Sequence, residues 1–352
     1  MKNMLLLLFS LSLAFLLAET LTRSLSQSLP PDIMIHYQSV KSDKGYELNP
    51  NDGIIQSQPP ARIEYRFYPY HFRDTNKKPH TTSILVLGDS FTFGWLLPPQ
   101  ETYVYQLQSA FDKVYGINQY QFLNAATPGW GTVEQLAYLE DFGEKIAPKF
   151  VLIFLNTDDI GRSLRRYSYQ LTNPTTRALT PNFHAVKKTW REMIYSSWLY
   201  SHSVFLHLLH DVMYDGIWSL IDRKAKYTDN IIIPMSDIVF DDEFAIRYAE
   251  ALFTRMNEWC KKHHAKLLII TTGYNAFYAN KLHDPTKIFL SHAESFFKKE
   301  GIPYYDMAHD FKNVIGHQTI LIPREGHPNA FGAATIAKLS WPWIKQQMEN
   351  SA

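Results

Sequence analysis

The hydrophobic and polar positions of the chain follow two alternating patterns from about residue 83 to the C-terminus. Short, almost continuous apolar runs predict strands that are buried on both faces. Longer segments with apolar residues at helical spacing predict helices between and after these strands. The predicted strands are 84–87, 121–124, 150–155, 266–271 and 302–305, and the predicted helices are 103–114, 132–145, 242–263 and 330–348. Such an alternation favours an α/β fold, with a parallel sheet flanked by helices.

Two segments interrupt this alternation. Residues 26–82 are polar, rich in proline and without sustained periodicity, so we expect an extended leader that packs on the following domain. The segment from about 161 to 241 is rich in Trp, Tyr and His and contains an amphipathic stretch at 198–218. It predicts a helical insertion after the third strand, which could act as a lid. The main domain would then span residues 83–350.

The N-terminus carries a basic residue, Lys2, followed by an apolar run over residues 4–18. This pattern is typical of a secretory signal or a short membrane anchor. The run is shorter than the roughly 20 residues of a full span, and Leu16 stands where a small residue would precede a cleavage site ending at Ala18. We expect residues 1–25 to form an uncleaved anchor, with a cleaved signal or a buried helix as alternatives. With Lys2 on the cytoplasmic side, the chain would face the periplasm or be secreted.

Composition narrows the function classes. The chain has 352 residues, 45% of them hydrophobic, which is enough for one large domain with insertions. Lys and Arg number 35 against 34 Asp and Glu, and no basic stripe is present, so nucleic acid is not an expected partner. The single cysteine, Cys260, excludes an intramolecular disulfide.

A serine follows the first predicted strand directly, in the run Leu87-Gly88-Asp89-Ser90. Reactive groups of open α/β sheets gather at the carboxyl ends of the strands, where loops leave them exposed. A serine hydroxyl is a weak nucleophile until a base accepts its proton. Asp and Ser are also common at the start of a helix, so this run alone does not identify a nucleophile.

A histidine in a loop before the last predicted helix is the candidate base. His327 lies in the turn Gly326-His327-Pro328-Asn329. Imidazole titrates near neutral pH, so it can accept a serine proton and return it to a leaving group. The flanking Gly, Pro and Asn predict a defined turn.

With these motifs the sequence resembles the GDSL/SGNH hydrolase family, in the subgroup of bacterial envelope proteins with an N-terminal apolar anchor. The resemblance spans about residues 70–343, without the insertion. The first family block matches residues 88–94 and supplies Ser90. The second matches residues 124–129 and supplies the Gly129 amide to the oxyanion hole, and the last matches the turn of His327. The resemblance implies an SGNH-hydrolase-like (flavodoxin-like) fold and needs no cofactor or metal.

The third family block reads Gly-x-Asn-Asp, and its Asn donates a hydrogen bond to the oxyanion. The best register places Asp158 at that position, within Asn156-Thr157-Asp158-Asp159. An ionised carboxylate would repel the developing negative charge. Three interpretations remain: Asp158 is protonated, Asn156 reaches into the oxyanion hole instead, or catalysis is weakened.

The acid that orients the histidine also departs from the family pattern. The family often has Asp three residues before the histidine, where this chain has Arg324. Glu325 stands two residues before His327 and can hold the imidazole tautomer as an Asp does. We therefore predict Glu325 as the third member of the site, with an exposed charge in a turn as the alternative.

Together these residues predict a serine esterase or deacylase. Ser90 would attack an ester carbonyl, His327 would act as base and then acid, and the amides of Ser90 and Gly129 would hold the oxyanion. The resemblance implies a small-molecule, glycan or lipid ester as substrate, with O-acetyl or acyl groups of the cell envelope as the class. Two alternatives stay open: an O-acyl or acetyltransferase with the same Ser–His machinery, and a catalytically impaired binding module.

Overall fold

A computed structural model describes residues 2–25, 39–56, 63–156, 158–173, 175–183, 203–206, 208–209, 241–272, 285–316, 318–322 and 326–351. The chain divides into two compact units. One contains Met1–Gln38, Ile55–Glu64 and Val186–Ile233, and the other contains Ser39–Ile54, Tyr65–Ala185 and Pro234–Ala352. The larger second unit carries every predicted site residue.

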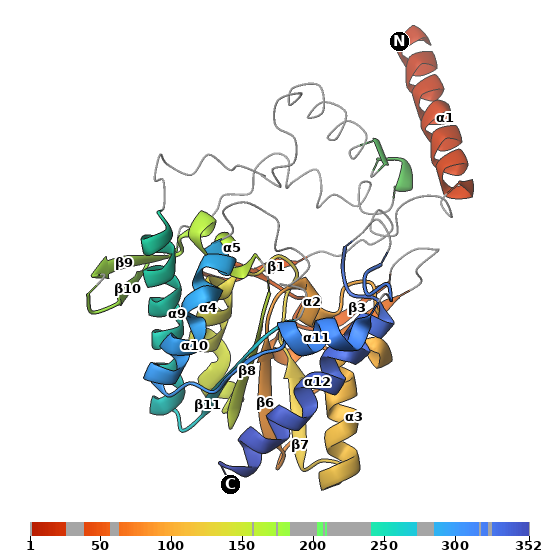
Figure 1. Ribbon diagram of the computed structural model, residues 1–352. Helices are drawn as coiled ribbons and strands as arrows, with labels where there is room; N and C mark the ends of the chain where they lie inside the picture. The colour runs from red at the N-terminus through yellow and green to blue at the C-terminus, as the bar shows by residue number, and fades with distance from the viewer. Residues whose placement is uncertain are drawn as a thin grey trace. The chain divides into compact units, whose positions relative to one another are not determined.

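A five-stranded parallel sheet forms the centre of the larger unit (Figure 1). Its order is β12-β11-β8-β6-β7. The strands are β6 (Thr82–Leu87), β7 (Tyr120–Asn124), β8 (Phe150–Leu155), β11 (Lys266–Thr271) and β12 (Tyr304–Asp306). All five predicted strands are present, although β12 begins later than expected because Ile302 and Pro303 form the connection. The predicted α/β class is confirmed.

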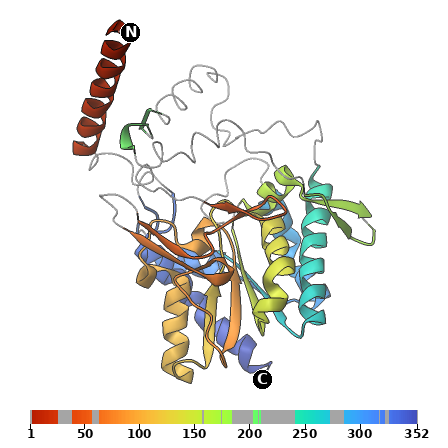
Figure 2. The same cartoon turned by 180° about the vertical axis from the view of Figure 1, so that it is seen from behind.

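Helices cover both faces of this sheet (Figures 1 and 2). One face packs against α4 (Thr132–Ile146), α9 (Asp242–Lys262) and α10 (Pro285–Glu300). The other packs against α3 (Tyr103–Tyr115), α11 (Ala308–Ile315) and α12 (Ala330–Glu349). The helices α3, α4, α9 and α12 were predicted to within about one residue, whereas α10 and α11 were not predicted.

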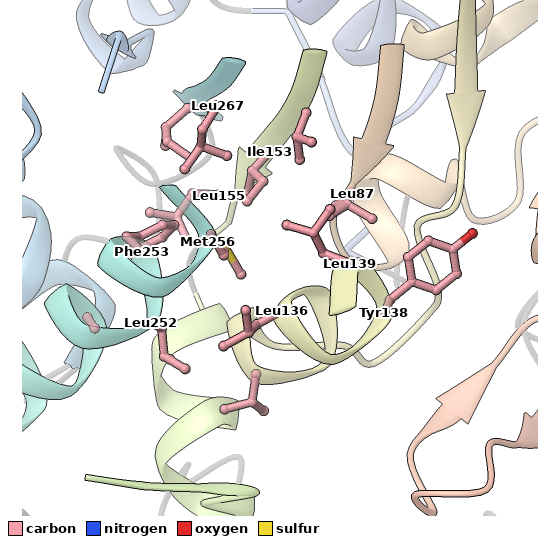
Figure 3. Packing of buried hydrophobic residues seen from close by; sticks show 14 of the residues in the cluster. Leu87, Leu136, Tyr138, Leu139, Ile153, Leu155, Leu252, Phe253, Met256 and Leu267 are labelled. Atoms are coloured by element: carbon pink, nitrogen blue, oxygen red, sulfur yellow. The ribbon is translucent and has the colours of Figure 1, made fainter. Parts of the chain in front are cut away.

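The strand residues alternate between two apolar clusters. Leu85 and Leu87 belong to the cluster on the side of α4 and α9, whereas Ile84 and Val86 belong to the cluster on the side of α3 and α12. Figure 3 shows the first cluster, in which Leu87, Ile153 and Leu155 of the strands meet Leu136, Leu139, Phe253 and Met256 of the helices. Because both faces are buried, each strand is apolar at almost every position, which is the pattern that predicted them.

The segment before β6 contains short strands. They are β1 (Val40–Lys41), β2 (Glu47–Leu48), β3 (Gly53–Gln56), β4 (Glu64–Tyr68) and β5 (Phe72–Arg73), with a 3-10 turn at Pro69–His71. Tyr46 and Leu48 are buried in the apolar cluster of α4. The indole of Trp130 donates to the carbonyl of Glu47 at 2.5 Å. Residues 39–54 therefore pack on the main domain through both apolar and polar contacts.

The chain after β8 differs from the helical insertion that the sequence suggested. It forms the short helix α5 (Asp159–Arg166) and an antiparallel hairpin of β9 (Tyr169–Asn173) and β10 (Ala178–Pro181). In the strand Tyr169–Asn173, Tyr169 and Leu171 are buried and the residues after each are exposed, which is the period of a strand and not of a helix. Within the predicted helix 198–218, residues 203–206 and 208–209 are described, and the rest lies outside the described residues.

The smaller unit contains the N-terminal helix α1 (Lys2–Ser24). The carboxylate of Glu19 accepts hydrogen bonds from the Ser203 hydroxyl at 2.7 Å and from the Val204 and Phe205 amides at 3.1 and 3.0 Å. Phe15 and Phe205 pack edge to face. Within the described residues, no helix has both the length and the apolar character that crossing a membrane requires.

Candidate active site

Ser90 is the first residue of the short helix α2 (Ser90–Phe93), directly after β6. The Asp89 side chain caps this helix by accepting from the Phe91 amide at 2.9 Å. Gly88 is required next to it, because an added Cβ would lie 2.0 Å from the Thr92 hydroxyl oxygen. Ser90 is 7% exposed. Ser90 therefore lies in a tight turn at the carboxyl edge of the sheet.

The loop of His327 meets this turn. The Nε2 atom of His327 lies 2.7 Å from the Oγ atom of Ser90. The loop is held by a hydrogen bond from the Ile322 amide to the His327 carbonyl at 2.8 Å. The aromatic rings of Phe91 and Trp95 lie 5.2 and 6.2 Å from the imidazole, centroid to centroid. At this distance the serine proton can pass directly to the imidazole.

The turn that follows His327 also begins the last helix. The Asn329 side chain accepts from the Gly332 amide at 2.9 Å and so caps α12. Its amide group donates to the Thr319 carbonyl at 2.8 Å. These bonds anchor the histidine loop at both sides. Glu325, the predicted orienting acid, lies outside the described residues, which resume at Gly326.

The loop after β7 carries Gly129, the predicted oxyanion donor. The Thr127 amide donates to the Gly88 carbonyl at 3.3 Å, and the Asn124 side chain donates to the Thr92 carbonyl at 3.1 Å. The loop is thus fastened to both sides of the nucleophile turn. Gly129 has φ of 81°, a left-handed conformation that disfavours residues with a Cβ. Its role as an oxyanion donor stays a prediction.

The two alternative side chains of the third block lie in different surroundings. The Asn156 side chain is buried, donates to Asp89 Oδ2 at 3.1 Å and accepts from the Thr272 hydroxyl at 3.0 Å. Asn156 therefore supports the carboxylate that caps α2. The Asp158 side chain is 42% exposed and pairs with Arg162 Nε at 3.2 Å and Arg165 Nη2 at 2.6 Å. The oxyanion role of each stays a prediction.

A cluster of buried acidic and basic side chains supports these loops, and it was not predicted from the sequence. Asp89 and Asp159 are both fully buried. Asp159 accepts from the Asn156 amide at 3.0 Å and the Gln135 side chain at 3.4 Å. Burial raises the pKa of Asp159 well above its usual range, and the neighbouring charge of Asp89 raises it further. Arg162 contacts both carboxylates, at 2.9 and 3.6 Å. The sequence contains one indication of this cluster: Arg162 stands three residues after Asp159 and four after Asp158, which is the spacing of ion pairs on one helix.

Among the described residues, no group of three or more His, Cys, Asp or Glu side chains is arranged to hold a metal ion. The chemistry available at the site is that of a serine hydroxyl, an imidazole and backbone amides.

The fold and the Ser90–His327 contact define the class: an α/β protein with a Ser–His pair at the carboxyl edge of a parallel sheet. Residues 86–335 match the family model described as GDSL-like Lipase/Acylhydrolase family. The chain belongs to this family and is an ester hydrolase. A search among curated proteins finds no relative.

Several solved structures resemble the chain at low identity. The crystal structure of TesA is 15% identical, with a TM-score of 0.43, over 75% of this chain and 98% of that one. The psychrotrophic esterase EstA from Pseudoalteromonas sp. is 15% identical, with a TM-score of 0.42, over 76% and 99%. Axe2, an acetylxylan esterase from Geobacillus stearothermophilus, is 14% identical, with a TM-score of 0.44, over 75% and 94%.

Proposed function

We propose that the chain is a serine esterase or deacylase that removes an O-acetyl or acyl group from a glycan or lipid of the cell envelope. The observation that carries this proposal is the 2.7 Å contact between His327 Nε2 and Ser90 Oγ. His327 takes the proton of Ser90 as the hydroxyl attacks the ester carbonyl, and it returns the proton to the leaving alcohol. Water then cleaves the acyl-enzyme by the same route.

The backbone amides of Ser90 and Gly129 are the proposed donors to the oxyanion. Both belong to loops at the carboxyl edge of the sheet, and the bond from Thr127 to Gly88 joins these loops. Amides that are already oriented cost no reorganisation when the charge develops, so they stabilise the tetrahedral intermediate. Glu325 is the proposed group that holds the imidazole tautomer.

Attachment to the envelope membrane is a separate proposal. It is supported by the apolar side chains that α1 exposes: Met4, Leu6, Leu7, Phe9, Leu11, Leu13, Leu16, Leu17 and Leu21. Fractionation of cells that express the full chain or a chain lacking residues 2–25 tests this proposal. The full chain is expected in the membrane fraction and the shortened chain outside it.

The catalytic proposal is tested with a chromogenic acetyl ester. Ser90→Ala is expected to lower kcat by at least about a thousandfold. The control is Ser340→Ala, since the Ser340 hydroxyl is also buried and donates only within α12. Undiminished turnover by Ser90→Ala would refute the nucleophile. Addition of a sugar acceptor, with detection of acylated sugar against free acid, separates acyl transfer from hydrolysis.

A further inference from the structure

One side chain, that of Arg162 on α5, bonds both the nucleophile turn and the loop after β7. Its Nη1 atom donates to Asp89 Oδ2 at 2.9 Å and to the Trp130 carbonyl at 3.0 Å. Its Nε atom lies 3.2 Å from Asp158 Oδ2. These partners belong to the nucleophile turn, the loop after β7 and the start of α5. The Arg162 side chain is 23% exposed, so it contacts its partners from a largely buried position.

The two Nη1 partners are the sequence neighbours of the two proposed oxyanion donors. Asp89 precedes Ser90, and Trp130 follows Gly129. A single nitrogen bonded to both partners therefore limits how far the two amides can move apart. This separation matters because the amides must both reach one oxygen atom in the transition state. A misplacement of about 1 Å in such a site can cost about a hundredfold in rate.

Arg162 also balances the negative charges around the nucleophile. Asp89 is fully buried, and a buried carboxylate is tolerated only with a charged or hydrogen-bonded partner. Asp158 occupies the position of an oxyanion donor in the family pattern. Burial lowers the pKa of the Arg162 guanidinium, but the neighbouring acidic side chains, with Asp89 contributing most, outweigh burial and raise it. The guanidinium is therefore permanently charged at neutral pH.

We propose that Arg162 is a positioning residue for the oxyanion hole, which fixes the separation of the Ser90 and Gly129 amides and, together with Arg165, neutralises Asp158. Arg162 thereby offsets the replacement of a neutral donor by a carboxylate at position 158. This inference rests on the proposed function, since it assigns Arg162 a role in the same reaction. It predicts an effect on kcat, because the amides bond fully to the oxyanion only in the transition state.

The first test compares Arg162→Gln with Arg177→Gln in chromogenic ester hydrolysis. Arg177 is a matched control, since it is 20% exposed and pairs with Glu250 and Glu300 on α9 and α10. Arg162→Gln is expected to lower kcat about a hundredfold with KM changed less than about threefold. Arg177→Gln is expected to keep kcat within about twofold. Wild-type kcat in a folded Arg162→Gln variant would overturn the inference.

The second test separates neutralisation of Asp158 from general loss of structure. Asp158→Asn is introduced into the Arg162→Gln background, and kcat is expected to rise about tenfold, since this removes a carboxylate that has lost one of its two arginine partners. No rise would overturn the neutralising role. If Arg162→Gln does not fold by circular dichroism, Arg162→Lys takes its place. This variant keeps the charge but lacks the rigid planar guanidinium whose Nε contacts Asp158 while Nη1 bonds Asp89 and Trp130, and unchanged kcat would again overturn the inference.

The two proposals fail differently. If wild-type protein hydrolyses no ester, or if Ser90→Ala remains fully active, the proposed function fails. If wild-type protein is active, Ser90→Ala is inactive and Arg162→Gln is unimpaired, only the role of Arg162 fails.

Discussion

The imidazole of His327 contacts the hydroxyl of Ser90 at 2.7 Å, although 237 positions separate the two residues in the chain. Ser90 follows β6, and His327 precedes α12, which packs on the sheet face next to α3. Because the carboxyl ends of parallel strands share one edge, the fold brings every loop of the site to that edge. The site therefore forms only once α12 has packed on the sheet, so ester hydrolysis requires the complete fold.

Replacement of His327 tests the base directly. His327→Gln removes the proton acceptor, and kcat is expected to fall between about 10²-fold and 10⁴-fold. His292→Gln is the control, because His292 is exposed on α10. The measurement is steady-state hydrolysis of a chromogenic ester, with circular dichroism to show that both variants fold. Equal rates in the two variants would exclude His327 as the base.

Replacement of Asp158 tests the departure from the family pattern. Asp158→Asn removes a negative charge and supplies an amide donor at the family position of the oxyanion Asn, so kcat is expected to stay the same or to rise. Asp112→Asn is the control, since Asp112 accepts from Gln108 on α3. A severe loss of kcat in Asp158→Asn would show that the carboxylate has a role of its own.

Arg73 fastens the turn that follows Ser90. Its side chain is 1% exposed, and its guanidinium donates to the carbonyls of Phe93, Gly94 and Leu97. The guanidinium also lies over the rings of Tyr65 and Phe93, 4.6 and 4.5 Å from their centroids. Arg73→Gln removes the guanidinium donors of these carbonyls, of which Gly94 alone keeps a printed amide donor, that of Leu97. We expect the free energy of unfolding to fall by about 3 kcal/mol.

Denaturant unfolding of Arg73→Gln measures this loss. The matched control is Arg66→Gln, because Arg66 is exposed on β4 and its replacement should change stability by less than about 0.5 kcal/mol. Equal midpoints for Arg73→Gln and wild-type protein would contradict a structural role for Arg73.

The sequence predicted the sheet well because its strands are buried on both faces. The runs at 84–87 and 150–155 are apolar without interruption, and the serine and histidine stand at loop positions that a parallel sheet brings to one edge. The hairpin β9–β10 escaped prediction, since only two of five residues of Tyr169–Asn173 are buried. Strand signals of this kind are weak beside a nearby helical pattern.

The supporting charges could not be predicted from spacing alone. Nothing in the run Asp158-Asp159 indicates that one carboxylate is buried and the other half exposed, because that difference depends on which side of α5 faces the sheet. Arg162 likewise reaches Asp89 across 73 positions. Such contacts follow from tertiary packing, and a helix of this length shows too few turns to define its buried face by sequence.

The buried carboxyl of Asp159 makes stability depend on pH. Burial, together with the charge of Asp89, raises the pKa of Asp159 well above its usual range. The Asp159 carboxyl of the folded protein therefore stays protonated at pH values at which the unfolded chain has already released this proton. As the pH rises above the unfolded pKa of about 4, the free energy of unfolding therefore falls. Asp159→Asn keeps an acceptor for the Asn156 amide and cannot ionise.

Thermal unfolding of wild-type protein and Asp159→Asn from pH 4 to pH 8 measures this dependence. The two melting temperatures are expected to agree most closely near pH 4, and Asp159→Asn is expected to become the more stable protein as pH increases. Asp43→Asn is the control, since Asp43 lies in the turn between β1 and β2 and is exposed. A melting-temperature difference that is constant across this range, or that grows toward low pH, would show that Asp159 is ionised in the folded protein.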